Sequence, residues 1–231
     1  MIPSRLKTAS LMAAGLALLL GCGSDTQELE MSNLIKSQFQ KRTSKADVAA
    51  SQAAVLKVRQ ADVNATPLPL LRVRIEGTGA LATLVEVDRK GPNASFQAAD
   101  GGSFTFRGGI LTGSRGLGQD LMSLAGPSLA QAARKGSYTK VYRYLDGDEV
   151  LIPLTVSCQM ETSYFGRLDI LAISYDVEEF SEVCRGSDPT HGSLEFQNYY
   201  WRDLNSGQIV QSRQFISPKF GRLEVERLNR Q

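Results

Sequence analysis

Hydrophobic and polar residues alternate along most of the chain after Pro67, and this spacing predicts β-strands. Leu71, Val73 and Ile75 are separated by arginines, so their side chains would lie on one face of a strand. Further runs of strand character are residues 81–87, 104–106, 138–145, 150–156, 168–177, 194–201, 209–216 and 223–228. Residues 146–148 and 205–207, rich in Asp, Asn and Gly, are expected hairpin turns. Regular strands with turn signals predict a mainly antiparallel sandwich or barrel.

Two segments depart from the β pattern. Residues 24–65 are polar and alanine-rich, and their apolar residues have helical spacing, which predicts a helical spacer. A partner-binding helix and a docked or solvated helix both fit this spacing. Residues 119–135 predict one short inserted helix, interrupted near Gly126 and Pro127. The expected fold is therefore all-β, with a spacer over residues 22–65 and an antiparallel β domain over 66–231.

The first 21 residues have the layout of a secretory signal. Arg5 and Lys7 precede an apolar run over residues 11–20, which is too short to span a bilayer as a helix. The run ends in Leu-Leu-Gly-Cys22, which resembles the bacterial lipobox, in which the cysteine is acylated (palmitate and similar chains) and becomes the first mature residue. Several acyl chains would make a permanent anchor. In the sorting pattern of such lipoproteins, Gly23 indicates the outer membrane, with the chain facing the periplasm.

Composition narrows the possible chemistry. The chain has 231 residues and a net charge of +2, from 26 Lys and Arg against 24 Asp and Glu. Because Arg5 and Lys7 leave with the signal, the mature chain is neutral and has no general attraction for nucleic acid. One histidine and three cysteines leave little room for zinc, haem or iron–sulfur ligation. We expect no cofactor and no bound metal.

Two cysteines remain after the anchor is assigned. The exported compartment is oxidising, so Cys158 and Cys184 are predicted to form one disulfide. A catalytic thiol and two free thiols remain alternatives. His191 is the only imidazole; it lies in an expected loop, and the chain has no Gly-x-Ser-x-Gly elbow, so a catalytic triad has little support.

Glycine is most frequent in residues 108–118. No Gly-Lys-Ser/Thr follows, and no alternating strands and helices surround the segment, so it meets neither nucleotide-binding fingerprint. Its glycines are expected to serve tight turns or close backbone approach.

Acidic residues allow a second class of function. Asp146, Asp148 and Asp169 could supply the paired carboxylates of a periplasmic carbohydrate hydrolase. The acids of residues 146–149, with others at 169–182, match no calcium-loop spacing, so a solvated turn is the favoured interpretation.

Aromatic residues gather in one late strand. Tyr199, Tyr200, Trp201 and Arg202 form a possible glycan or partner contact, because flat aromatic faces suit sugar rings. In a strand, however, Tyr199 and Trp201 share one face and Tyr200 takes the other. At least one face is then ordinary core packing.

The chain resembles the YjbF/GfcB family of bacterial lipoproteins associated with exopolysaccharide or capsule production. The resemblance rests on the lipobox with Cys22 and on segments over residues 104–106, 109–113, 116–121, 198–203, 206–210 and 212–218. Gly113, Asp120, Trp201 and Gln214 carry the pattern and are candidates for structural roles. The resemblance implies an antiparallel β domain and transfers no catalytic residue.

We therefore expect a non-enzymatic outer-membrane lipoprotein that supports polysaccharide secretion. Its expected partners are the membrane, through the N-terminal lipid, and either export proteins or the glycan itself. A hydrolase with paired carboxylates and an envelope assembly factor without glycan contact are the alternatives.

Overall fold

A computed structural model describes residues 58–145, 150–161, 164–188 and 192–230. Cys22, the signal, most of the spacer, the turn with Asp146 and Asp148, and His191 lie outside the described residues. The described part folds as antiparallel strands with two short helices, which confirms the predicted class. None of the described helices has the length and apolar character needed to cross a membrane.

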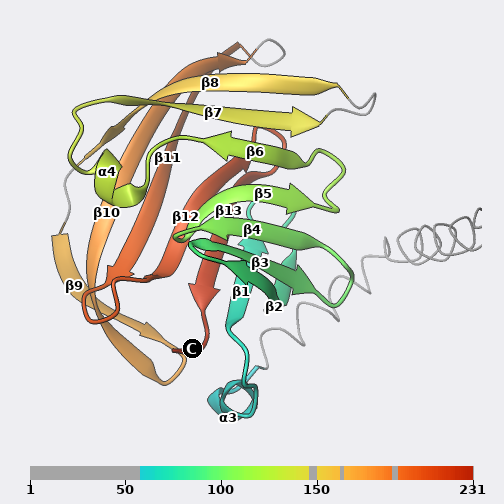
Figure 1. Ribbon diagram of the computed structural model, residues 1–231, viewed down its shortest axis with the longest axis vertical. Helices are drawn as coiled ribbons and strands as arrows, with labels where there is room; N and C mark the ends of the chain where they lie inside the picture. The colour runs from blue at the N-terminus through green and yellow to red at the C-terminus, as the bar shows by residue number, and fades with distance from the viewer. Residues whose placement is uncertain (1–57, 146–149, 162–163, 189–191, 231) are drawn as a thin grey trace, which may run out of the picture. The chain divides into compact units, whose positions relative to one another are not determined.

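The elements follow one another as a long series of strands (Figure 1). They are α3 (Gln60–Asn64), β1 (Leu70–Ile75), β2 (Leu81–Lys90), β3 (Asn93–Ala98), β4 (Ser103–Arg107), β5 (Ile110–Arg115), β6 (Leu121–Ala125), α4 (Leu129–Ala132), β7 (Tyr138–Leu145), β8 (Leu151–Met160), β9 (Tyr164–Ile170), β10 (Ile173–Asp188), β11 (Gly192–Asp203), β12 (Ile209–Ser217) and β13 (Gly221–Arg227).

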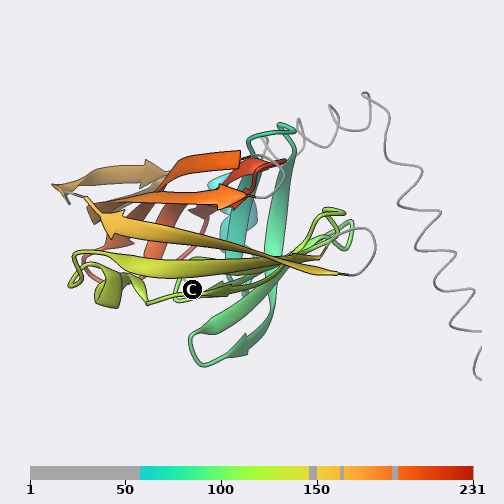
Figure 2. The same ribbon diagram turned by 90° about the horizontal axis from the view of Figure 1, so that it is seen from above.

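The strands form a single sheet. Its order is β5-β4-β3-β2-β1-β13-β12-β11-β10-β8-β7-β6, and β9 pairs only with β10. The first and last strands of this series, β5 and β6, lie side by side, and the sheet curls back on itself (Figures 1 and 2). The result is a nearly closed barrel whose interior holds the main core.

Side chains, not a strand ladder, join β5 to β6. The Leu121 amide donates to Ser114 Oγ at 2.9 Å, and Arg115 Nη1 donates to the Leu121 carbonyl at 3.2 Å. Asp120 accepts hydrogen bonds from Ser114 Oγ and from the Leu117 amide, both at 3.1 Å. These contacts close the seam where the ladder stops.

Alternation along the strands decides which side chains enter the core. In β7 the buried positions alternate with exposed or half-buried ones, so Tyr138, Lys140, Tyr142 and Tyr144 all point inward. A second, smaller cluster lies outside the barrel, where Val63 of α3 packs with Tyr175, Val177 and other apolar residues. The C-terminal end of the predicted spacer is thus docked on the sheet.

The predicted helix over residues 119–135 is largely wrong. Leu121 and Leu124 belong to β6, which pairs with β7 so that Leu124 faces Tyr142. Five residues before a Gly-Pro break are too few to nucleate a stable helix, whereas the free edge of β7 offers a ladder. Only the single turn α4 is helical, capped by Ser128, whose Oγ accepts from the Gln131 amide at 3.3 Å.

The predicted strand over residues 168–177 is two strands. The chain reverses at Leu171, which has φ 53° and is the only described residue other than glycine with a positive φ. Leu171 gives no turn signal in the sequence, so the hairpin between β9 and β10 could not be predicted. Strands β3 and β5 were also missed, because their short, small-residue sequences have weak apolar alternation.

Candidate functional site

The aromatic segment of β11 does not form one site. Tyr200 is 1% exposed and lies in the barrel core, whereas Tyr199 and Trp201 stack on the opposite face, with ring centroids 6.1 Å apart. Trp201 Nε1 donates to Glu179 Oε2 at 3.1 Å. Arg202 pairs with Glu178 and lies over the Phe180 ring. Contact with a glycan or partner through Tyr199 and Trp201 stays a prediction.

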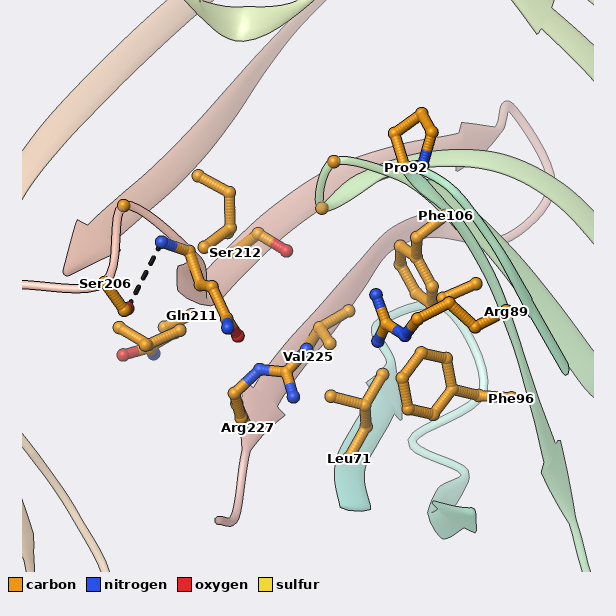
Figure 3. A pocket seen from close by; sticks show the side chains of 17 residues that line it. Leu71, Arg89, Pro92, Phe96, Phe106, Ser206, Gln211, Ser212, Val225 and Arg227 are labelled. Atoms are coloured by element: carbon orange, nitrogen blue, oxygen red, sulfur yellow. Dashed lines mark hydrogen bonds between the residues drawn. The ribbon is translucent and has the colours of Figure 1, made fainter. Parts of the chain in front are cut away.

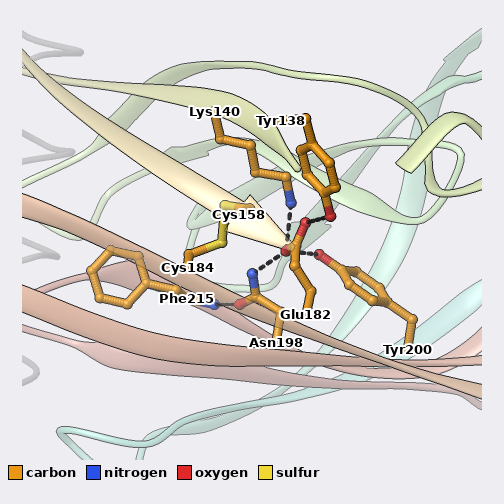
Figure 4. The surroundings of a disulfide bond; sticks show 8 residues. All are labelled: Tyr138, Lys140, Cys158, Glu182, Cys184, Asn198, Tyr200 and Phe215. Atoms are coloured by element: carbon orange, nitrogen blue, oxygen red, sulfur yellow. Dashed lines mark hydrogen bonds and ion pairs between the residues drawn. A yellow bond between two sulfur atoms is a disulfide. The ribbon is translucent and has the colours of Figure 1, made fainter. Parts of the chain in front are cut away.

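A buried polar cluster surrounds Glu182 inside the barrel (Figure 4). Glu182 Oε2 accepts from Lys140 Nζ at 2.7 Å and from Asn198 Nδ2 at 2.6 Å. Glu182 Oε1 accepts from Tyr138 OH at 2.5 Å. Lys140 and Glu182 are 2% and 1% exposed, so this ion pair is kept out of water.

The pKa of Glu182 reflects two opposed effects. Burial raises the pKa of this carboxyl, but the charge of Lys140 and the hydrogen bonds of Lys140, Tyr138 and Asn198 outweigh that effect and hold the pKa below its ordinary value of 4.5. Burial and the charge of Glu182 raise the pKa of Tyr138 and Tyr200. Glu182 is therefore an ionised, fully bonded acceptor, and this cluster is suited to holding β7, β10 and β11 together.

The disulfide lies directly beside this cluster. Cys158 of β8 and Cys184 of β10 are cross-strand neighbours with Cα atoms 4.1 Å apart, and they are bonded as the sequence predicts. Cys158, Cys184 and Glu182 bring ligand-type atoms within 4.8 Å of one another. Because both sulfur atoms are used in the disulfide, this group is not a metal site.

Of the three acids proposed for hydrolysis, the structure describes only Asp169. Asp169 is exposed at the β9–β10 hairpin and accepts from Ser174 Oγ at 2.5 Å. It lies opposite Ser174, whereas Trp201 lies opposite Glu179, five positions along β10. Five positions are roughly 17 Å along a strand, so Asp169 and Trp201 do not line one cleft.

A pocket of about 240 Å³ opens at one end of the barrel (Figure 3). It lies where β1 and β12 begin and where β2, β4 and β13 end. Its floor is apolar and is formed by Leu71, Ala94, Phe96, Phe106 and Val225.

The rim of the pocket is polar. Ser206, Gln208 and Gln211 come from the β11–β12 turn and the start of β12. The ionisable side chains among its lining residues are two arginines, Arg89 of β2 and Arg227 of β13, whose guanidinium groups point toward each other across the space.

Gly109 shapes one wall of the pocket. It has φ 84°, and a Cβ at this position would lie 2.5 Å from Ile209 Cβ, so only glycine lets the β4–β5 turn approach β12 this closely. Gln214 fixes the same turn, because its Nε2 donates to the Gly109 carbonyl and its Oε1 accepts from the Leu111 amide, each at 2.8 Å. The expectation that this segment's glycines serve turns and close approach is confirmed.

Two residues that carry the family pattern, Gln214 and Asp120, hold β5 in place. Gln214 anchors its start, and Asp120 caps the turn after it by accepting from the amides of Gly116 and Leu117. A Cβ on Gly113 would meet the Leu121 carbonyl at 3.5 Å, an ordinary van der Waals distance, so the space there does not require glycine. The hydrogen bonds of Asp120 and Gln214 give these two residues structural roles at the barrel closure.

Sequence reasoning did not identify the pocket arginines. Arg227 has the same strand parity as Leu223 and Val225, whose side chains face the core. The alternation of β13 therefore could have predicted that Arg227 points inward. Arg89 gave none, because a register shift between Glu86 and Asp88 changes the parity of β2 just before it.

The fold and pocket define a class: a nearly closed antiparallel barrel with a small, partly apolar binding pocket at one end. The chain belongs to the family described as the group 4 capsule polysaccharide lipoprotein gfcB, YjbF, which it matches over residues 35–228. This confirms the resemblance drawn from the sequence.

A solved structure of another protein has a similar fold. The crystal structure of the hypothetical lipoprotein YmcC from Escherichia coli (K12) is 17% identical and has a TM-score of 0.63, with 82% of this chain and 97% of that chain covered. At this identity the likeness concerns the fold alone. No curated protein matches the chain.

Proposed function

We propose that this chain is a non-enzymatic lipoprotein, anchored in the outer membrane through Cys22, that supports capsule or exopolysaccharide secretion by holding a sugar residue of the glycan in the barrel-end pocket. Membership of a capsule polysaccharide lipoprotein family supports a role in capsule or exopolysaccharide production. The pocket supports the mode of action, since its apolar floor and polar rim are features of small-ligand sites.

The observation that carries the proposal is the lining of the pocket. Its two ionisable residues, Arg89 and Arg227, are cations, and arginine binds and positions anions but rarely exchanges protons at neutral pH. A glycosidase would use two opposed carboxylates. The pocket therefore favours binding over hydrolysis.

A gene deletion tests the proposal at the level of the cell. Loss of the gene is expected to reduce exopolysaccharide output or change its composition, and the natural gene is expected to restore it. Unchanged output and composition in the deletion strain would contradict the proposal.

Crosslinking separates glycan contact from a general assembly role. Crosslinked cells are expected to give complexes that contain glycan or polysaccharide-export proteins. A set of partners without either would favour an envelope assembly factor instead.

A further inference from the structure

We infer that the barrel-end pocket selects an anionic sugar residue, whose carboxylate or phosphate is held between Arg89 and Arg227 while the ring lies over the apolar floor. This inference rests on the proposed function and adds the chemical class of the ligand.

The register of the sheet brings the two cations to one end of the barrel. Arg227 is the cross-strand neighbour of Leu71, and Arg89 is the cross-strand neighbour of Ala94. Directly opposed residues share a face of the sheet. Both arginine side chains therefore lie on the inner face, together with Leu71 and Ala94 of the pocket floor. The ligand space therefore lies between a cation from β2 and a cation from β13 (Figure 3).

The electrostatics of this end of the barrel favour an incoming anion. Burial lowers the pKa of Arg227, and the positive charge of Arg89 lowers it further, although Glu86 and Tyr175 act in the opposite direction. Glu86 forms an ion pair with Arg89 and accepts from its Nε at 2.6 Å, so an anion would reach Arg89 through its remaining N–H donors. An anion between the guanidinium groups would reduce their mutual repulsion, and paired N–H donors suit carboxylate and phosphate oxygens.

The size of the pocket limits the ligand. Its volume of about 240 Å³ is below the range of about 300 to 1,000 Å³ that drug-sized ligands occupy, so one sugar residue fits better than a long oligosaccharide. Phe96 and Phe106, whose rings are in edge-to-face contact, line the pocket together with Leu71, and these side chains offer apolar surface to the ring carbons. Gln211 and Ser206 at the rim can bond hydroxyl groups.

Calorimetric titration of the full chain in detergent tests the inference. The probes are trigalacturonic acid for a carboxylate, glucose 1-phosphate for a phosphate, and maltotriose as a neutral saccharide. We expect an anionic probe to bind at least about tenfold more tightly than maltotriose, because a hydrogen bond to a charged group contributes more binding free energy than a hydrogen bond between neutral groups. Added salt should weaken binding of the anionic probe.

Single substitutions locate the site. Arg227→Gln and Arg89→Gln are each expected to weaken binding of the anionic probe by about tenfold. Arg89 is 47% exposed, so its substitution keeps the test valid if Arg227→Gln fails to fold. Arg185→Gln is the matched control, since Arg185 is an exposed cation of β10 outside the pocket, and it should leave binding unchanged.

The outcomes separate the two proposals. Tight binding of either anionic probe, lost in the pocket variants alone, supports the inference and shows which group is recognised. Equal binding of maltotriose and the anionic probes overturns the anionic site but leaves glycan binding standing. Binding that Arg185→Gln weakens as much as Arg89→Gln also overturns the site. If none of the probes binds, both proposals fail.

Discussion

At the scale of single residues, Glu182 is a buried charge on which the polar cluster inside the barrel is centred. It accepts hydrogen bonds from Lys140, Tyr138 and Asn198 in a space that excludes water. Removing one partner of a buried ion pair, such as Glu182 with Lys140, leaves the other charge buried and uncompensated. Its contribution to stability is therefore measured best by removing one partner and then both.

Glu182→Gln is expected to lower the free energy of unfolding by about 3 to 5 kcal/mol, measured by urea denaturation. Adding Lys140→Met removes the stranded cation and should restore a large part of this loss. Glu195→Gln is the control, because Glu195 pairs with Arg185 at the surface, where both side chains are over 60% exposed (64% and 61%), and it should change stability little. Equal losses for Glu182→Gln and Glu195→Gln would contradict this role.

Glu182 also predicts a dependence of stability on pH. Its pKa in the folded chain is below the ordinary value of 4.5, so its contribution is present above pH 4.5 and is lost as the pH falls through the folded pKa. Urea midpoints should therefore fall more steeply below pH 4.5 in the natural chain than in the double variant Lys140→Met/Glu182→Gln. Parallel profiles would show that other carboxyls account for the loss.

Gly109→Ala is expected to destabilise the protein by about 1 to 3 kcal/mol, because its Cβ would overlap Ile209. Gly108→Ala separates this clash from backbone strain, since Gly108 also has a positive φ, of 57°, but a Cβ there would meet nothing within 4 Å. Thermal denaturation of the two variants should show the larger loss for Gly109→Ala. The same loss in both would mean that φ alone is responsible.

At the scale of elements, a covalent bond and a polar cluster meet on β10. The disulfide joins β8 to β10, and Glu182 on β10 reaches Lys140 on β7 and Asn198 on β11. Four strands that are neighbours in the sheet, β7, β8, β10 and β11, are thereby fixed to one another (Figure 4).

Replacing both Cys158 and Cys184 with alanine is expected to cost about 3 kcal/mol, because the bond restricts a loop with a sequence separation of 26 in the unfolded chain. Denaturation with and without a reductant measures this loss. The reductant should destabilise the natural chain and leave the alanine variant unchanged. Two free thiols in a non-reducing mass map would refute the bond.

Strands were predictable where a long run of alternating apolar and polar residues has one solvent-exposed face and one core face. Strand β7 was predicted with its observed bounds, because its alternation matches its burial. Strands β5 and β6 could not be predicted this way, since their conformation depends on neighbours brought from other parts of the chain: β4 and Gln214 for β5, and β7 for β6. Pairing of this kind overrides local spacing.

At the scale of the whole molecule, function depends on how the barrel is attached and what its pocket holds. The family assignment covers residues 35–228 and concerns capsule polysaccharide lipoproteins. The lipid anchor lies before this range, at Cys22, and is a prediction from the sequence.

Cys22→Ser tests the anchor. We expect an unprocessed precursor that fails to fractionate with the outer membrane, because the serine has no thiol for acylation. Mass spectrometry of the N-terminus and membrane fractionation measure the outcome. Gly21→Ala is a suitable control, because alanine keeps a small residue before the cysteine and processing should remain normal. Normal outer-membrane fractionation of Cys22→Ser would refute the lipobox.

The sequence by itself determined the all-β class, the strand parity of β1 and β7, and the family, and it predicted the pairing of Cys158 with Cys184 that the structure shows. These features follow from local alternation, from the small number of cysteines, and from motifs. Only the tertiary structure decided the reversal at Leu171, the side-chain seam between β5 and β6, and the meeting of Arg89 with Arg227. The physical reason is that a strand's spacing fixes the face of each side chain, whereas a pocket depends on which strand ends the closing sheet brings together.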